Sequence, residues 1–454
     1  MKRVFLALLS AALCWAAFPP LAWAPAGWVA LAPLLLALEG ATARQGRILG
    51  FLFGTAFFAA SASWLFGIFA WGSVGLWAFL GLFGSLFGAL VALAGDRGWA
   101  WRLLGIPALW VGIEWLRAEG NPLRFGWFVL GLSQSSSPRM LQAADLAGAY
   151  GLSFLMVSVS SALVFGLKRR RSFAVAALVV VGVAVYGTWA LGHWDRVGTV
   201  PAAVVQGEDV SEKDLRGLTR DLGIQGPRLV VWPELALPFD PTLDPVTMGA
   251  LQGMVREMGT VLVVGCTNGT PLKKGWDNRA LVLGPDGGIL GDYVKHVPIQ
   301  FFDDGVAGRG FPTFPTPAGR LGICICYDLD FPWVTRGLVR AGAEVLAVPT
   351  YDAVFWGETQ HRQHTANARV RAVTHRRFLV RACSSGISQV IAPDGRIEAE
   401  VPGKEKGAAV GRVAPVSGLS PCDRGGWLLA PLCAVWGAVV AMRLLWTRVG
   451  SRIP

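Results

Sequence analysis

Charged residues are scarce in this sequence of 454 residues. Asp, Glu, Lys and Arg make up 16% of the chain, against roughly 25% in an average soluble domain. Hydrophobic residues make up 53%. Most of them lie in long uncharged runs in the first part of the chain, whereas residues 199–421 have the composition of an ordinary globular protein. A wholly soluble protein is therefore excluded, and the sequence predicts a membrane part joined to a globular part.

Acidic residues are fewer than basic ones, 30 against 41, which gives a formal net charge of +11. In a soluble protein this excess would indicate nucleic-acid binding. Here much of the Lys and Arg lies in short loops beside apolar runs, so we interpret it as a topology signal and expect no nucleic-acid partner. Charges inside the apolar runs are sparse, which argues against an ion pathway. A transporter or a binding scaffold stays the second alternative to an enzyme.

The seven cysteines show no regular spacing, which argues against a disulfide framework and against a zinc module. A single thiol is then free to be reactive. His361 and His364 have the spacing of one helical face, but no acid is placed as in a zinc protease, so His364 is expected to have a structural hydrogen-bonding role. We expect no metal and no diffusible cofactor. The cysteines are Cys14, Cys266, Cys324, Cys326, Cys383, Cys422 and Cys433.

Long apolar runs predict about seven transmembrane helices in a membrane domain over residues 1–196, and one more within residues 427–446. Two of the runs are shorter than the roughly 17 residues that a spanning helix needs, so they could be tilted, interfacial or wrongly bounded. Residues 1–24 resemble a signal peptide, but Pro25 follows the cleavage-like site, and a retained first helix is preferred. The runs cover residues 4–24, 25–38, 48–69, 74–94, 103–116, 146–166, 173–191 and 427–442.

Basic residues fall in every second loop, as the positive-inside rule requires for short cytoplasmic loops. Both termini are therefore expected in the cytoplasm, and the globular part is expected on the outer face of the membrane. The basic positions are Lys2, Arg3, Arg44, Arg47, Arg97, Arg102, residues 168–171, Arg443, Arg448 and Arg452.

The globular part alternates short β-branched runs with amphipathic stretches, which predicts sheets covered by helices. Three of these runs are followed by unusual polar residues, Glu234, Lys295 and Cys326. Cys326 follows the run 321–325, and period-two alternation places it on one face with Cys324 but nearer the loop. Cys326 is therefore the better nucleophile candidate, and Cys324 is expected to pack as a small hydrophobe. A thiol needs a base, and the intermediate needs a cation or N–H donors for its oxyanion.

At these residues the chain resembles the nitrilase superfamily, and within it the family of apolipoprotein N-acyltransferases. The resemblance rests on WPE at residues 232–234, YVKH at 293–296, GICICYD at 322–328 and DAVFWG at 352–357. It extends over nearly the whole chain, because that family also has apolar spans before and after such a domain. It implies a multi-pass α-helical membrane bundle plus an α/β, nitrilase-like αββα sandwich domain over residues 199–421.

The resemblance also implies a function. The enzyme would be an N-acyltransferase of the bacterial cytoplasmic (inner) membrane, with its catalytic domain in the periplasm. It would move an acyl chain from a membrane phospholipid through a Cys326 thioester to the N-terminal amine of S-diacylglyceryl-cysteine on apolipoproteins. Glu234, Lys295 and Cys326 would form the triad, and we expect a monomer. A membrane-tethered amidase acting on small amides is the first alternative.

Around the triad the sequence departs from the family pattern. The chain reads HVPIQFFDDGVAG over residues 296–308, so the family's loop glutamate has no certain counterpart, and Asp303 or Asp304 is the nearest guess. Asp328 stands two residues after Cys326, where the family often has Glu. The backbone N–H of Tyr327 is the expected oxyanion donor. These four residues are the expected supporting group of the site.

Overall fold

The computed structural model describes residues 1–192, 198–269 and 275–450, with side chains up to residue 446. The predicted domain boundary at residue 196 and the predicted basic residue Arg452 lie outside these ranges. The chain divides into two compact units, which we describe separately. One is a helical unit, formed by residues 1–192 and 424–454, and the other is a mixed α/β unit, formed by residues 193–423.

The helical unit consists of helices that cover each apolar run of the sequence. In the described residues, four helices, α6, α9, α10 and the C-terminal helix, are long and apolar enough to cross a membrane, and a bent pair at 43–69 makes up to five. The number of crossings stays a prediction. The helices are α1 (Lys2–Ala17), α2 (Ala24–Val29), α3 (Ala32–Leu38), α4 (Ala43–Ser61), α5 (Phe66–Phe69), α6 (Gly72–Ala94), α7 (Ile106–Ala118), α8 (Pro138–Leu141), α9 (Ala144–Gly166), α10 (Arg171–Leu191), α15 (Pro421–Arg424) and α16 (Leu429–Gly450).

Helices α4 and α6 pack backbone against backbone through glycines at four-residue spacing. A Cβ atom added at Gly50 would lie 2.0 Å from the carbonyl oxygen of Gly84, and one added at Gly46 would lie 2.3 Å from that of Gly88. Small residues at this spacing let two helices approach closely in a lipid environment, where no hydrophobic force drives them together. The glycines therefore determine which faces of α4 and α6 meet.

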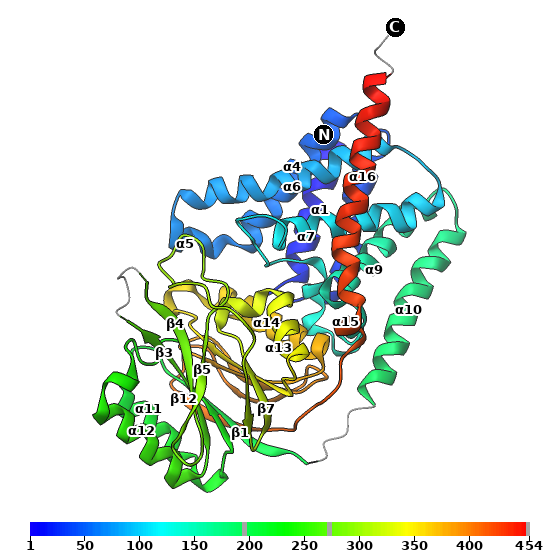
Figure 1. The fold of residues 1–454 in the computed structure, drawn as a ribbon. Helices are drawn as coiled ribbons and strands as arrows, with labels where there is room; N and C mark the ends of the chain where they lie inside the picture. Colours follow the sequence, from blue (N-terminus) through cyan, green and yellow to red (C-terminus); the bar gives the residue numbers. More distant parts are fainter. Residues whose placement is uncertain (193–197, 270–274, 451–454) are drawn as a thin grey trace. The chain divides into compact units, whose positions relative to one another are not determined.

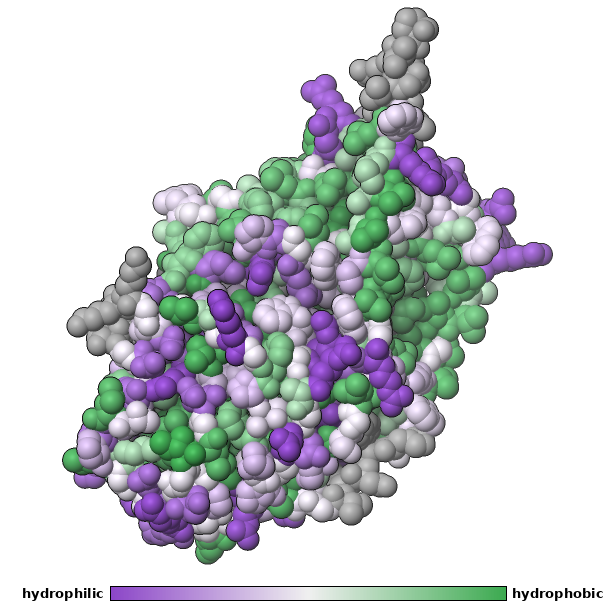
Figure 2. Space-filling model, viewed as in Figure 1, coloured by the Kyte–Doolittle hydropathy of each residue, from purple (hydrophilic) through white to green (hydrophobic). Residues whose placement is uncertain are grey.

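The outer surface of the helical unit is apolar. Leu178, Val181 and Val185 on α10 and Leu432 and Val435 on α16 are each more than half exposed. Figure 2 shows hydrophobic side chains over these helices and hydrophilic ones gathered toward the end that carries the N-terminus. Patches of this extent do not occur on soluble monomers, so the surface fits contact with lipid.

The α/β unit contains two six-stranded sheets, with strand orders β12-β1-β2-β3-β4-β5 and β11-β10-β9-β8-β7-β6 (Figure 1). Each sheet combines parallel strands in its centre with antiparallel ones toward its edges. The strands are β1 (Val200–Gln206), β2 (Leu229–Val231), β3 (Val261–Asn268), β4 (Asp277–Leu283), β5 (Ile289–Val294), β6 (Thr313–Thr316), β7 (Gly319–Ile323), β8 (Val345–Thr350), β9 (Phe378–Cys383), β10 (Ser388–Ile391), β11 (Ile397–Val401) and β12 (Gly407–Val413).

Alternation along the strands builds the layers. In β1, Ala202 and Val204 pack into the core between the sheets, whereas Ala203 and Val205 pack outward against α11 (Glu212–Asp221) and α12 (Pro245–Met258). Side chains of α13 (Pro332–Arg340) and α14 (Glu358–His375) join the core on the other side, at the second sheet. The unit is an αββα sandwich (Figure 1), and the predicted fold class is confirmed.

Candidate active site

Glu234 lies three residues after the end of β2 and is 3% exposed. Its carboxylate accepts three hydrogen bonds of 2.7 Å each. Lys295 Nζ and Asn278 Nδ2 donate to Oε1, and the backbone N–H of Tyr351 donates to Oε2. These partners come from β4 and from the segments that follow β5 and β8, so three strands fix the orientation of one carboxylate.

Lys295 follows β5 directly and is 1% exposed. Its Nζ lies 2.7 Å from Glu234 Oε1 and 2.7 Å from Asp304 Oδ2. Asn278 Nδ2 connects the two carboxylates, because it donates to Asp304 Oδ1 at 2.9 Å as well as to Glu234. Of the two aspartates that the sequence left open, Asp304 is therefore the one beside the lysine. Asp303 accepts from Trp276 Nε1 instead.

Cys326 begins a single turn that runs to Asp330, and its φ is +49°, in the left-handed region that non-glycine residues rarely adopt. Strand β7 ends at Ile323, so the alternation predicted along residues 321–326 stops before the thiol. The reason is local: the chain turns sharply at Cys326. Its Sγ donates a weak hydrogen bond to the carbonyl of Tyr351 at 3.7 Å. Strain of this kind persists only where the surroundings enforce it, and it is common at active sites.

Asp328 joins the segment around Lys295 to the segment around Cys326. Its buried carboxylate accepts from the backbone N–H groups of His296 at 3.0 Å, Val297 at 2.7 Å and Ile325 at 3.0 Å, and from the Tyr293 hydroxyl at 2.8 Å. Asp328 therefore holds the backbone of both segments in place.

Tyr327, the predicted oxyanion donor, directly follows Cys326. Its ring packs edge-on against Phe331 with centroids 5.0 Å apart.

The electrostatics of the site keep the Cys326 thiol protonated at rest. Burial raises the pKa of the Cys326 thiol well above its ordinary value, with Glu234 adding to the shift and Lys295 opposing it. Burial also raises the pKa of the Glu234 carboxyl. The negative charge of Asp304 adds to this rise, and the positive charge of Lys295 opposes it. Burial lowers the pKa of Lys295, but the charges of Asp304 and Glu234 raise it by more. The pKa of Lys295 therefore lies well above its ordinary value, and the ammonium stays charged. A thiol in this state needs a base to become a nucleophile, and Glu234 is the candidate for that role.

Behind this site lies a second buried charge network that the sequence did not predict. Asp352, next to Tyr351, pairs with Arg381 at 2.5 Å and with His364 Nδ1 at 2.7 Å, and all three are buried. Burial works to raise the pKa of Asp352, but His364 and Arg381 outweigh it and hold it well below its ordinary range. The backbone carbonyl of Asp352 also accepts from Ser385 Oγ at 2.7 Å. The network holds the residue next to Tyr351, whose N–H donates to Glu234 and whose carbonyl accepts from Cys326.

The structure thus brings together Glu234, Lys295, Cys326 and Asp304. Asp328 bonds to the backbone of the segments that carry Lys295 and Cys326, and Asp303 contacts Trp276. Sequence reasoning missed Asn278, which stands between Asp277 and Arg279 at the start of β4, where a polar residue gives no signal. Among the described residues, no group of three His, Cys, Asp or Glu side chains could hold a metal ion. His361 contacts the Ala353 carbonyl at 2.9 Å instead.

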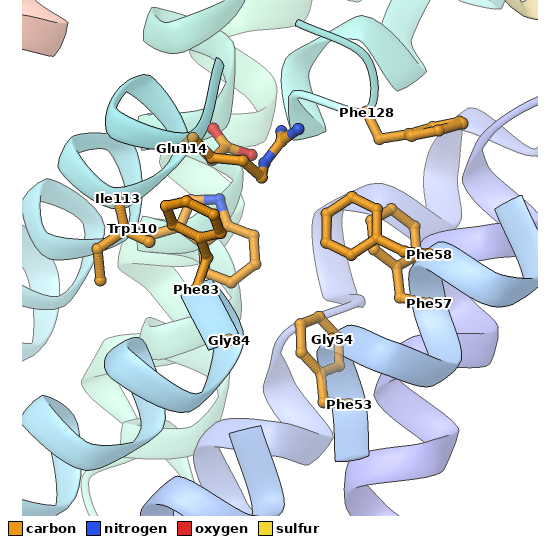
Figure 3. Close-up of a pocket in the computed structure, with 11 residues that line it drawn as sticks. Phe53, Gly54, Phe57, Phe58, Phe83, Gly84, Trp110, Ile113, Glu114 and Phe128 are labelled. Carbon is orange, nitrogen blue, oxygen red and sulfur yellow. The ribbon is translucent and has the colours of Figure 1, made fainter. Parts of the chain in front are cut away.

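The helical unit has its own buried carboxylate, Glu114 on α7, at an aromatic pocket between α4, α6 and α7. Figure 3 shows Phe53 and Phe57 on one side of this pocket and Phe83 and Trp110 on the other. The space is ≈ 30 Å³, about the volume of one water molecule in the liquid.

Comparison with known proteins places this geometry in a class. Residues 203–417, which form the αββα sandwich, fit the family model "Carbon-nitrogen hydrolase". Residues 10–162 fit the family model "Apolipoprotein N-acyltransferase N-terminal domain". An amidase from Nesterenkonia sp. has a solved structure with a TM-score of 0.41 and 21% identity, over 50% of this chain and 92% of the amidase.

Curated relatives match the chain from end to end. The apolipoprotein N-acyltransferase of Geobacter metallireducens is 32% identical over 97% of this chain and 95% of its own length. The apolipoprotein N-acyltransferase of Methylococcus capsulatus is 29% identical over 96% of this chain and 95% of its own length. The chain belongs to the apolipoprotein N-acyltransferase family. The resemblance inferred from the sequence is confirmed, and the amidase alternative is weakened, because the membrane part also matches.

Proposed function

We propose that this protein transfers a fatty acyl chain from a membrane phospholipid to the N-terminal amine of S-diacylglyceryl-cysteine on apolipoproteins, through a thioester on Cys326. The observation that carries the proposal is the fixed Glu234 carboxylate, held by Lys295, Asn278 and the Tyr351 N–H next to a buried thiol. Membership of the family supports the choice of substrates.

In the first half-reaction, Glu234 takes the proton of Cys326 as the sulfur attacks the ester carbonyl of the phospholipid. The developing oxyanion is stabilised by the Lys295 ammonium and the backbone N–H of Tyr327. The C–O bond then breaks, Glu234 returns the proton to the leaving oxygen, and a lysophospholipid departs. Cys326 is left as a thioester, and Glu234 is again a carboxylate.

In the second half-reaction, the amine of the acceptor attacks the thioester carbonyl. Glu234 takes a proton from the attacking nitrogen and gives it to the departing sulfur, so an amide forms and the thiol is restored. The kinetics are ping-pong, because the lysophospholipid leaves the covalent thioester before the acceptor amine reacts with it. All groups required are on the chain, and no step requires a cofactor.

Mass spectrometry of the intact protein after incubation with one defined phospholipid tests the first half-reaction. We expect a mass increase of one acyl chain on wild type, its loss on adding a diacylglyceryl-cysteine peptide, and no adduct on Cys326→Ala. An adduct on Cys326→Ala, or full transfer by that variant, would overturn the assignment. Release of ammonia from small amides without acyl transfer would favour the amidase instead.

The relatives and the apolar helices make this a bacterial membrane protein. We place it in the inner membrane as a monomer, with a membrane domain of about seven spans, one C-terminal span and the catalytic domain over residues 199–421 in the periplasm. All seven native cysteines are buried, so introduced cysteines report on topology. An impermeant maleimide should label Ile224→Cys in spheroplasts, and Arg170→Cys only after the membrane is opened. The reverse pattern would refute this orientation.

A further inference from the structure

A cavity of ≈ 240 Å³ lies in the helical unit, where α3, α6, α9 and the start of α7 converge. It is amphipathic: Leu35, Val91 and Val164 line it together with charged side chains from three helix ends. None of these residues belongs to the catalytic network described above. The cavity holds several times the ~30 Å³ of one water molecule, so it has room for a polar group.

Two acids and two bases gather at this cavity. Arg102, whose side chain is 9% exposed, donates to both carboxylate oxygens of Asp96 at 3.3 and 3.1 Å and to Glu39 at 2.9 Å. Lys168 lies 3.2 Å from Glu39 and is 54% exposed, and Asp96 is 52% exposed. Arg102 is thus fixed inside, while Lys168 and Asp96 present an opposite pair of charges at the opening.

The segment that supplies Arg102 has unusual backbone. Residues Trp101–Gly105 form a short π-helix ahead of α7, a form that is rare and frequent at functional sites. It turns both Trp101 and Arg102 toward the cavity that they line. The Trp101 Nε1 is buried and has no hydrogen-bond partner among the described residues. A buried donor without a partner is costly.

We propose that this cavity binds the headgroup of a zwitterionic phospholipid, one that carries a phosphate and a primary ammonium. The phosphate lies against Lys168, and the ammonium lies against Asp96. The cavity has two acidic and two basic side chains, so a zwitterionic headgroup can pair with a charge of each sign. A headgroup whose only charge is the phosphate leaves Asp96 facing a like charge. The apolar side of the cavity covers the start of the acyl chains. This lipid is not the acyl donor used at Cys326, and the site does not depend on the proposed reaction.

Native mass spectrometry of the full-length protein in detergent tests the proposal, with phosphatidylethanolamine and phosphatidylglycerol as probes. Cys326→Ala is used as the background, so that no lipid is consumed. Lys168→Gln should bind phosphatidylethanolamine about tenfold more weakly, as expected for the loss of one charge-assisted hydrogen bond. Asp96→Asn should reverse the preference in favour of phosphatidylglycerol. Arg170→Gln, in the same basic loop but not lining the cavity, should bind as the background does.

Equal losses in Lys168→Gln and Arg170→Gln would overturn the proposal, because they would indicate general attraction of lipid to a basic loop. Unchanged binding in both Lys168→Gln and Asp96→Asn would overturn it as well. A third arm adds millimolar inorganic phosphate or soluble glycerophosphoethanolamine. Retention of the lipid supports a lipid site, whereas its displacement by inorganic phosphate alone would show a site for free anions and refute the lipid.

Discussion

Glu234 in the α/β unit and Glu114 in the helical unit are both buried, 3% and 4% exposed, but they have different surroundings. Glu234 accepts three hydrogen bonds, one of them from an ammonium group. Glu114 accepts from the N–H of Leu130 at 2.8 Å, and its other oxygen has no hydrogen-bond partner among the described residues. The α/β unit thus fixes its reactive groups with networks of paired charges.

The helical unit obtains its order differently, from close backbone packing at Gly46, Gly50 and their partners on α6. The difference follows from the chemistry each unit supports. A base and a cation must stay charged inside protein, which requires dense hydrogen bonding. Helices in lipid associate through close packing, with hydrogen bonds between them at particular points. Changes that remove charge partners should therefore damage the α/β unit most, and changes of size should damage the helical unit most.

The largest effect is expected for Lys295→Met. It leaves Glu234 and Asp304 as buried carboxylates without their cation, at a cost of about 3–5 kcal/mol, and it removes an oxyanion partner, which lowers the rate roughly a thousandfold. Thermal unfolding and single-turnover thioester formation measure the two effects. Wild-type rates in this variant would show that Lys295 is not in the reaction.

Arg381→Met should rank second. It leaves Asp352 paired with His364 alone and loosens the peptide between Glu234 and Cys326, with a loss of about 3 kcal/mol. Arg396→Met is the matched control, because Arg396 is 51% exposed in its pair with Asp394 and such pairs contribute about 0–1 kcal/mol. Arg381→Lys should recover part of the rate of thioester formation. Equal losses in the two methionine variants would contradict the positioning role.

Gly50→Leu tests the helical unit. Its Cβ would meet the Gly84 carbonyl, and overpacking of this kind costs about 1–3 kcal/mol. Gly75→Leu on α6 is the control, since a Cβ there meets nothing within 4 Å. The midpoint of thermal unfolding in detergent should fall for the first variant only. A fall for both would mean that glycine matters here for reasons other than close approach.

Asp304→Asn should change the pH dependence more than the maximal rate. Glu234 acts as a base only when it is a carboxylate, so the rate of thioester formation falls as pH drops through its pKa. The negative charge of Asp304 helps to raise that pKa, and its removal should lower the pKa and move the acid limb to lower pH. A limb that stays in place or moves to higher pH would show that Glu234 is not the titrating base.

Glu114→Gln should have the smallest effect, less than about 1 kcal/mol in the free energy of unfolding. The amide keeps an acceptor for the Leu130 N–H and avoids burying a charge. Glu234→Gln, made in parallel, should abolish thioester formation. If Glu114→Gln unfolds the protein as readily as Lys295→Met, the contrast between the two units is wrong.

Much of this arrangement could be predicted from the sequence. Runs of apolar residues and period-two alternation are local patterns, and they predicted the two regions and sheets covered by helices. The sandwich class and the family were implied by the resemblance of the sequence motifs. They also singled out Glu234, Lys295 and Cys326, whose catalytic roles stay predictions. The end of β7 at Ile323 was missed, because a sharp turn at a non-glycine residue leaves no pattern.

The sequence by itself determined that uncharged runs belong in lipid and that polar residues end the strands of a covered sheet, since hydrophobic burial depends on residue type and spacing. Only the tertiary structure decided which polar groups meet. Glu234 pairs with a lysine 61 residues away and with a peptide N–H 117 residues away. It also decided that Asp304, and not Asp303, contacts Lys295. Hydrogen bonds depend on distances of a few tenths of an ångström between groups remote in the chain, and no local pattern encodes them.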